Sequence, residues 1–198
     1  MLNKWRRKIE PLTATLGKRF SGLGLSPTAW STIGFVFAIA SATSFGLSNN
    51  STALPLVLIG SILLIVSGFF DIVDGSVARY ANQSTKKGAF IDSVYDKFAE
   101  IFLFIGISLG GLANPILCLV AASMSLMVSY SRARAESLGI ELKGIGIGER
   151  AERLLVIAVA GFIPSPNSIE IATLFVAVLS AITLLQRILH IVRKLRLA

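Results

Sequence analysis

Cysteine and histidine are nearly missing from this chain of 198 residues, which contains one of each. The cysteine, Cys118, lies in an apolar run and is interpreted as a small core residue, because one cysteine can form neither a disulfide within the chain nor a CxxC zinc site. The histidine, His190, lies near the basic C-terminus and is given no role. Enzymes that use a Ser-His-Asp or Cys-His arrangement are therefore not expected.

Acidic residues are also scarce, with 11 Asp and Glu against 19 Lys and Arg, and the formal net charge is +8. Such an excess of bases often indicates a nucleic-acid binder. However, 54% of the residues are hydrophobic and the mean hydropathy is +0.74, more than a soluble domain of this length needs. The composition predicts a membrane-embedded protein whose bases meet anionic lipid headgroups or an anionic substrate, with no nucleic acid.

Six apolar segments are candidates for membrane-spanning helices, because about 20 apolar residues cross the hydrocarbon core. They are residues 28–47, 54–70, 90–109, 115–134, 151–163 (a short one) and 169–191. Residues 1–20 carry six bases without an uninterrupted apolar core, which is typical of an amphipathic juxtamembrane helix on the membrane surface and not of a signal peptide. We expect a single all-α integral membrane domain over residues 1–198.

The distribution of bases supports six spans. Segments 48–52, 110–114 and 164–168 contain no Lys or Arg, and all 19 bases fall at the N-terminus, around Arg79–Lys97, around Arg132–Arg153 or at the C-terminal end from Arg187. Lys and Arg concentrate in cytoplasmic loops. The sequence therefore predicts a multi-pass protein of the cell membrane with both termini in the cytoplasm and the polar motif below facing the cytoplasm.

Four aspartates stand out within residues 71–96. Asp71 and Asp74 are three residues apart and share one helical face, and Asp92 and Asp96, four residues apart, share another. Carboxylates near a membrane are costly, and four together repel one another unless cations bind. Hard oxygen ligands favour Mg²⁺ or Mn²⁺, and four carboxylates suffice for two ions that grip a diphosphate. The alternative, a set of interhelical salt bridges, has too few bases nearby in the sequence.

The spacing of this motif resembles that of a known family. Its pattern is D-x2-D-G-x2-A-R-x8-G-x3-D-x3-D, running from Asp71 to Asp96. At all eight fixed positions it is similar to the signature of the CDP-alcohol phosphotransferases. The resemblance implies that all four aspartates bind metal, that Asp96 is also the general base, and that the protein is a homodimer. It further implies a CDP-linked lipid as donor, contacted by Thr28, Ala29, Trp30, Ser31, Gly75, Ala78, Arg79 and Thr85. From the residues alone, Gly75 and Ala78 also fit tight helix packing, and Ser26 or Thr28 is a helix cap.

Arginines cluster in the polar segments of the second half of the chain. We expect five of them to form a pocket for the phosphate of a phosphorylated polar alcohol, because guanidinium forks match phosphate oxygens. They are Arg132, Arg134, Arg150, Arg153 and Arg187. The alternative is membrane anchoring, with pairing to nearby glutamates.

The region of these arginines resembles the branch of the family that forms phosphatidylinositol phosphate or its archaeal counterpart. That resemblance implies inositol 1-phosphate as acceptor and CDP-archaeol or CDP-diacylglycerol as donor. The N-terminal stretch favours the archaeal form. Two rivals stay open: transfer to glycerol 3-phosphate, and an ion transporter that uses intramembrane carboxylates.

Overall fold

The computed structural model describes residues 2–48, 53–142 and 144–196, with side chains from Leu12 onward except that of Ala53. This part of the chain is all-helical, without a strand, as predicted. Its seven helices are α1 (Leu2–Ser21), α2 (Pro27–Gly46), α3 (Ala53–Tyr80), α4 (Lys86–Leu109), α5 (Pro115–Ser137), α6 (Arg150–Ala160) and α7 (Ser168–Arg196).

Local sequence signals set several helix starts. The Ser26 hydroxyl accepts a hydrogen bond from the Ala29 amide at 3.2 Å, and Pro27 follows in the first turn of α2, so Ser26 is the cap. Thr85 caps α4 and Asn114 caps α5 in the same way. Each cap satisfies main-chain donors that the helix cannot pair internally, which matters most in a membrane.

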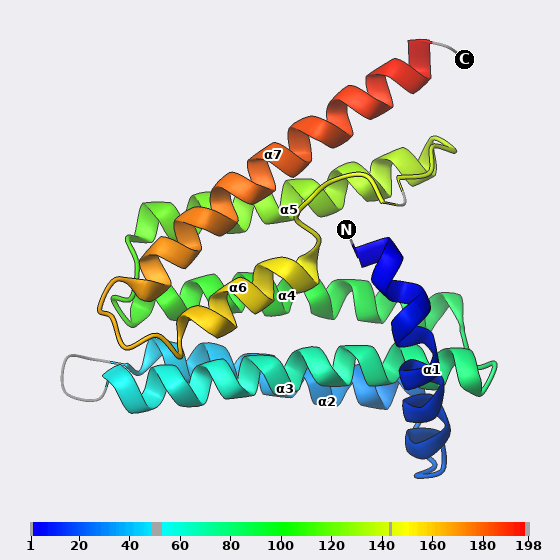
Figure 1. Cartoon of the computed structure of the whole chain (residues 1–198), viewed down its shortest axis with the longest axis horizontal. Helices are drawn as coiled ribbons and strands as arrows, with labels where there is room; N and C mark the ends of the chain where they lie inside the picture. The colour runs from blue at the N-terminus through cyan, green and yellow to red at the C-terminus, as the bar shows by residue number, and fades with distance from the viewer. Residues whose placement is uncertain (1, 49–52, 143, 197–198) are drawn as a thin grey trace.

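The helices form two groups that meet at the centre of the molecule (Figure 1). Helix α2 packs along α3 and α4, helix α5 packs along α7, and α6 contacts both α3 and α7. Helix α1 runs across the ends of α2 and α3 and packs against α3. The end of α3, the start of α4 and the C-terminal end of α7 all lie toward the same end of the bundle as α1 (Figure 1).

Small residues allow the helices of the first group to approach closely. The Ser41 hydroxyl of α2 donates a hydrogen bond to the Gly60 carbonyl of α3 at 2.7 Å. Gly106 of α4 lies directly against the main chain of Ala42. Packing of this kind, and not hydrophobic burial, holds helices together in lipid. Large apolar side chains remain exposed along the outer helix faces, as a lipid-facing surface requires.

Each of the six predicted apolar segments overlaps a helix, although residue 47 and residues 161–163 lie beyond the ends of α2 and α6. Four helical stretches are long and apolar enough to cross a membrane: Pro27–Gly46, Leu54–Tyr80, Pro115–Ser137 and Ser168–Arg196. Helix α4 carries many charges, and the 11 residues of α6 cover only about 17 Å of a core about 30 Å thick. Four candidate spans are therefore established, and six spans remain a prediction.

The N-terminal helix forms over Leu2–Ser21, close to the predicted bounds, and its position on the membrane surface remains a prediction. Met1 and residues 49–52 of the predicted external segment 48–52 lie outside the described part. Cys118 is buried, as expected of a core residue.

Candidate active site

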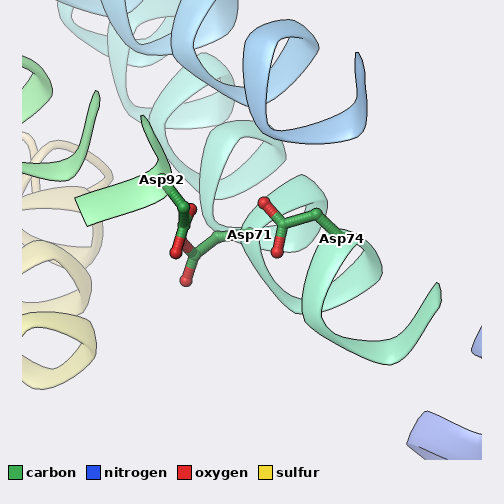
Figure 2. A group of neighbouring side chains, drawn as sticks. All are labelled: Asp71, Asp74 and Asp92. Atoms are coloured by element: carbon green, nitrogen blue, oxygen red, sulfur yellow. The ribbon is translucent and has the colours of Figure 1, made fainter. Parts of the chain in front are cut away.

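Three of the four motif aspartates form a compact group where α3 and α4 face each other (Figure 2). Asp71, Asp74 and Asp92 each place one carboxylate oxygen so that the three atoms lie within 4.8 Å of one another. Asp74 is 6% exposed, and its Oδ2 has no hydrogen-bond partner within the described residues. A buried carboxylate oxygen without a donor needs a cation or a proton. The group therefore fits a hard divalent cation.

Asp96, the fourth aspartate, lies beside this group but is held differently. Its Oδ1 is 2.7 Å from Arg150 Nη1, which also donates a hydrogen bond to Asp71 Oδ1 at 3.0 Å. All four aspartates, together with Arg150, line a small cavity of about 20 Å³. Arg150 thus links the two helices that carry the motif. Its role as their counter-ion was not predictable from the sequence, because it lies more than 50 residues after Asp96 along the chain. Asp96 as a metal ligand remains a prediction.

A pocket of about 210 Å³ opens on one side of the carboxylates, and we call it the Gly75 pocket. Asp74 and Asp92 form part of its wall. Of the residues predicted to contact the donor, six line it: Thr28, Ser31, Gly75, Ala78, Arg79 and Thr85. The other two do not. Ala29 is not part of the lining, and Trp30 is buried, where its ring stacks on Phe70 with centroids 5.7 Å apart.

Glycines open the Gly75 pocket. A Cβ on Gly75 would come within 3.2 Å of Arg79 Nη1, so glycine leaves room for the guanidinium. A Cβ on Gly88 would lie 3.1 Å from Thr85 Oγ1 and 3.5 Å from Thr28 Oγ1. Glycine at position 88 therefore lets the starts of α2 and α4 come together at the pocket. Close helix packing and room for a ligand, the two interpretations given above for Gly75, are therefore compatible.

A larger pocket of about 790 Å³ opens on the other side of the carboxylates, and we call it the arginine pocket. Asp71 and Asp96 form part of its wall. Four of the five predicted phosphate ligands also line it: Arg132, Arg150, Arg153 and Arg187. Arg134 is not among the lining residues, and its Nη1 donates a hydrogen bond to the Ser137 hydroxyl at 3.4 Å.

The arginines of this pocket are held to different degrees. Arg132 pairs with Glu136 at 2.8 Å on an exposed face, where such a pair is weak. Arg187 is 4% exposed, and its guanidinium donates to the main-chain carbonyls of Val128, at 2.6 Å, and Ile145, at 3.1 Å. Arg153 is also buried and bonded. The pocket therefore combines one exposed surface arginine with several buried ones that are held by hydrogen bonds.

Two residues of this region were not predicted. Lys97 lines the arginine pocket, directly after Asp96 in the sequence. Glu100 is 1% exposed and accepts hydrogen bonds from Arg153. The sequence could have indicated Glu100 as part of the site, because Asp92, Asp96 and Glu100 recur at intervals of four residues and share one face of α4. The partner of Glu100 was not predictable, since it lies on another helix.

Comparison with known proteins finds relatives along nearly the whole chain. Residues 26–192 match the family model for CDP-alcohol phosphatidyltransferase. The archaetidylinositol phosphate synthase of Pyrococcus horikoshii is 34% identical over 197 residues, 100% of both chains. That of Methanothermobacter thermautotrophicus is 39% identical over 163 residues, 81% of this chain and 80% of the relative. The phosphatidylinositol phosphate synthase of Streptomyces avermitilis is 34% identical over 214 residues, 98% and 84% of the two chains.

Solved structures show the same fold. The crystal structure of Mycobacterium tuberculosis phosphatidylinositol phosphate synthase with CDP-DAG bound superposes with a TM-score of 0.76 at 25% identity, covering 91% of this chain and 94% of that one. The same enzyme with manganese and citrate gives a TM-score of 0.75 at 26% identity, covering 90% and 88%. Because the family model spans nearly all of the helical bundle, the chain belongs to the CDP-alcohol phosphatidyltransferase family, as its aspartate motif predicts.

Proposed function

We propose that this protein transfers the lipid phosphoryl group of a CDP-linked lipid to inositol 1-phosphate, which gives an inositol-phosphate lipid and CMP. One observation carries the proposal: each pocket is lined by two of the four neighbouring motif aspartates. Asp74 and Asp92 border the Gly75 pocket, and Asp71 and Asp96 border the arginine pocket. A donor and a phosphorylated acceptor that enter from opposite sides would meet at these aspartates.

The metal would be held first by Asp71, Asp74 and Asp92, whose oxygens already converge, with Asp96 as the further ligand. We propose two ions, Mg²⁺ or Mn²⁺, because four carboxylates exceed what one small cation needs. When bound, the ions neutralise the diphosphate and stabilise the charge that develops on the departing CMP. The manganese in the structure of the M. tuberculosis relative supports this assignment.

The chain's own residues would do the remaining work. In the Gly75 pocket, Arg79 binds the diphosphate, while the hydroxyls of Thr28 and Thr85 position the cytidine part. In the arginine pocket, the guanidinium groups orient the phosphorylated alcohol so that its free hydroxyl points toward Asp96. Asp96 accepts the proton of that hydroxyl. The oxygen forms a bond to the lipid-side phosphorus, and the bond from this phosphorus to the bridging oxygen breaks and releases CMP.

The arginines of the arginine pocket support a phosphorylated alcohol as acceptor over an unphosphorylated one. An unphosphorylated alcohol offers no anionic group for Arg150, Arg153 and Arg187 to bind. The names of the relatives in P. horikoshii, M. thermautotrophicus and S. avermitilis support inositol phosphate as the acceptor. The two archaeal relatives favour CDP-archaeol as donor, and CDP-diacylglycerol remains the second donor to test, since it is bound in the M. tuberculosis structure.

We also propose that the protein is a homodimer with six membrane spans, both termini in the cytoplasm and both pockets open to the cytoplasm. The grouping of the described polar ends at one end of the bundle supports a single active-site side (Figure 1). Labelling of single cysteines introduced at residue 87 and residue 112, in a Cys118→Ala background, with an impermeant maleimide on intact cells tests the orientation. Labelling at residue 87 and not at residue 112 would contradict it.

The function is tested with purified protein in lipid nanodiscs containing CDP-archaeol or CDP-diacylglycerol, with Mn²⁺ or Mg²⁺. The acceptors are inositol 1-phosphate, glycerol 3-phosphate and free inositol, and the readout is CMP release together with the mass of the lipid product. We expect turnover with inositol 1-phosphate and none with free inositol or in EDTA. Preferential use of glycerol 3-phosphate, or equal use of free inositol, would overturn the acceptor assignment.

A further inference from the structure

We infer that Glu100 is a positioning residue for the acceptor: by holding Arg153, it fixes the turn that starts α6 and so orders the arginine pocket. This inference rests on the proposed function. Glu100 lies on α4 one turn after Asp96 and is 1% exposed. Its Oε1 and Oε2 accept hydrogen bonds from Arg153 Nε at 2.9 Å and Arg153 Nη2 at 3.1 Å. This is a two-pronged pair, the geometry that orients a guanidinium most firmly.

The third nitrogen of Arg153 extends the contact to the main chain. Arg153 Nη1 donates to the Gly148 carbonyl at 2.8 Å. The Gly148 amide in turn donates to the Thr183 hydroxyl of α7 at 2.9 Å. A Cβ on Gly148 would lie 2.7 Å from Leu179 Cγ, so only glycine fits against α7 here. One continuous series of contacts therefore links α4, α6 and α7 through the two polar main-chain groups of a single residue.

Gly148 stands two residues before Arg150. The hydrogen bonds that hold the Gly148 main chain therefore also fix the position of the Arg150 main chain. Glu149 caps α6, with a capping box in which its amide donates to Glu152 Oε2 at 3.0 Å. From this fixed start, Arg150 extends to Asp96 on α4, parallel to the contact between Arg153 and Glu100. Two ion pairs, about one helical turn apart on each helix, thus link α6 to α4, one at the motif aspartates and one at Glu100.

The ion pair between Arg153 and Glu100 differs from the pair between Arg150 and Asp96 in the groups that it contacts. Arg150 contacts the carboxylates of Asp71 and Asp96, whereas the carboxylate of Glu100 forms its ion pair with Arg153. Three of the five N–H groups of Arg153 are used by Glu100 and Gly148, which leaves two for a phosphate in the arginine pocket that Arg153 lines. Glu100 thereby decides which N–H groups of Arg153 remain available to the acceptor.

A buried ion pair is poor evidence of a stabilising role, because well-packed apolar residues often replace such pairs at no cost in stability. A role in positioning explains why a charged pair is used at this place. If so, loss of the Glu100 charge alters acceptor binding more than donor binding, since the Gly75 pocket contains no residue of the Glu100 contact series.

The test compares wild type, Glu100→Gln and the double variant Glu100→Gln/Arg153→Gln, with Glu170→Gln as a matched control at the other end of the bundle. KM for inositol 1-phosphate is measured at saturating CDP-lipid, and the Kd values of inorganic phosphate and of CMP are measured by calorimetry. For Glu100→Gln we expect the acceptor KM and the phosphate Kd to rise about tenfold, as for one displaced charge-assisted hydrogen bond. The CMP Kd should stay within about twofold, and the control should match wild type.

The double variant separates positioning from simple neutralisation of a buried charge. Two glutamines can pair without a charge, so its melting temperature should recover relative to Glu100→Gln while the acceptor KM stays high. Recovery of both, or an unchanged acceptor KM and phosphate Kd in Glu100→Gln, would overturn the inference. If Glu100→Gln does not fold, Glu100→Asp, which keeps the charge but shortens its reach to Arg153, takes its place, and an unchanged acceptor KM and phosphate Kd in that variant would overturn the inference. If wild type binds phosphate but transfers to no inositol phosphate, the proposed function fails, and the phosphate Kd still tests Glu100.

Discussion

Arg150 provides the sharpest test of how the carboxylates are held together. Its Nη1 lies 3.0 Å from Asp71 Oδ1 and 2.7 Å from Asp96 Oδ1, so it is the cation that bridges α3 and α4 in the described structure. Replacement Arg150→Met keeps an unbranched apolar chain and removes the charge. The four aspartates then face one another without this counter-ion, and we expect the protein to be less stable when metal is withheld.

The size of the effect follows from exposure. Removing one partner of a fully buried pair costs about 3–5 kcal/mol, and an exposed pair contributes about 0–1 kcal/mol. The Arg150 and Asp96 side chains are 17% and 21% exposed, and Asp71 is 41% exposed, so the pair lies between these limits. We expect a loss of about 2 kcal/mol, which corresponds to a melting temperature lower by about 4–8 °C for a chain of this length.

Thermal unfolding in detergent, followed by tryptophan fluorescence, measures the effect in EDTA and in MnCl₂. A ligand that binds only the folded state adds about 2.7 kcal/mol at a hundred times its Kd. Mn²⁺ should therefore raise the melting temperature of Arg150→Met more than that of wild type, because no internal cation competes for the carboxylates. The control is Arg132→Met, whose exposed pair should cost at most about 1 kcal/mol. Equal melting temperatures for the two variants in EDTA would refute the reasoning.

Three further predictions concern Asp96, the Gly75 pocket and the helix packing. Asp96→Asn should lower kcat for CMP release by about 10²-fold or more while the CMP Kd changes little, and near-normal turnover would exclude Asp96 as the base. Thr85→Ala removes the N-cap of α4 and should cost about 1 kcal/mol and raise the KM for CDP-lipid, whereas Thr85→Ser should preserve both. Gly106→Ala places a Cβ on the main-chain carbonyl of Ala42 and should destabilise by about 3 kcal/mol. Gly68→Ala, where a Cβ meets nothing within 4 Å, should leave the melting temperature unchanged or higher, and similar losses for the two glycines would contradict the packing account.

Much of the fold was predictable because membrane helices follow from local properties of the chain. Apolar runs of sufficient length, the Ser26 cap and the prolines at helix starts are all readable residue by residue. The number of crossings was not, because α4 is both charged and helical and α6 is only 11 residues long. Whether such helices cross depends on how neighbouring helices and bound ions shield their charges, which no local pattern contains.

The sequence alone identified the motif and the family to which it belongs. Helical periodicity places Asp71 with Asp74, and Asp92 with Asp96, and the spacing of the whole motif identifies the family. Only the tertiary structure decided how charges far apart along the chain are combined. It joins Arg150 to two of the aspartates, pairs Arg153 with Glu100, and leaves Arg134 outside the arginine pocket. The physical reason is that periodicity fixes which face of a helix a side chain occupies, while its partner depends on which helix packs against that face.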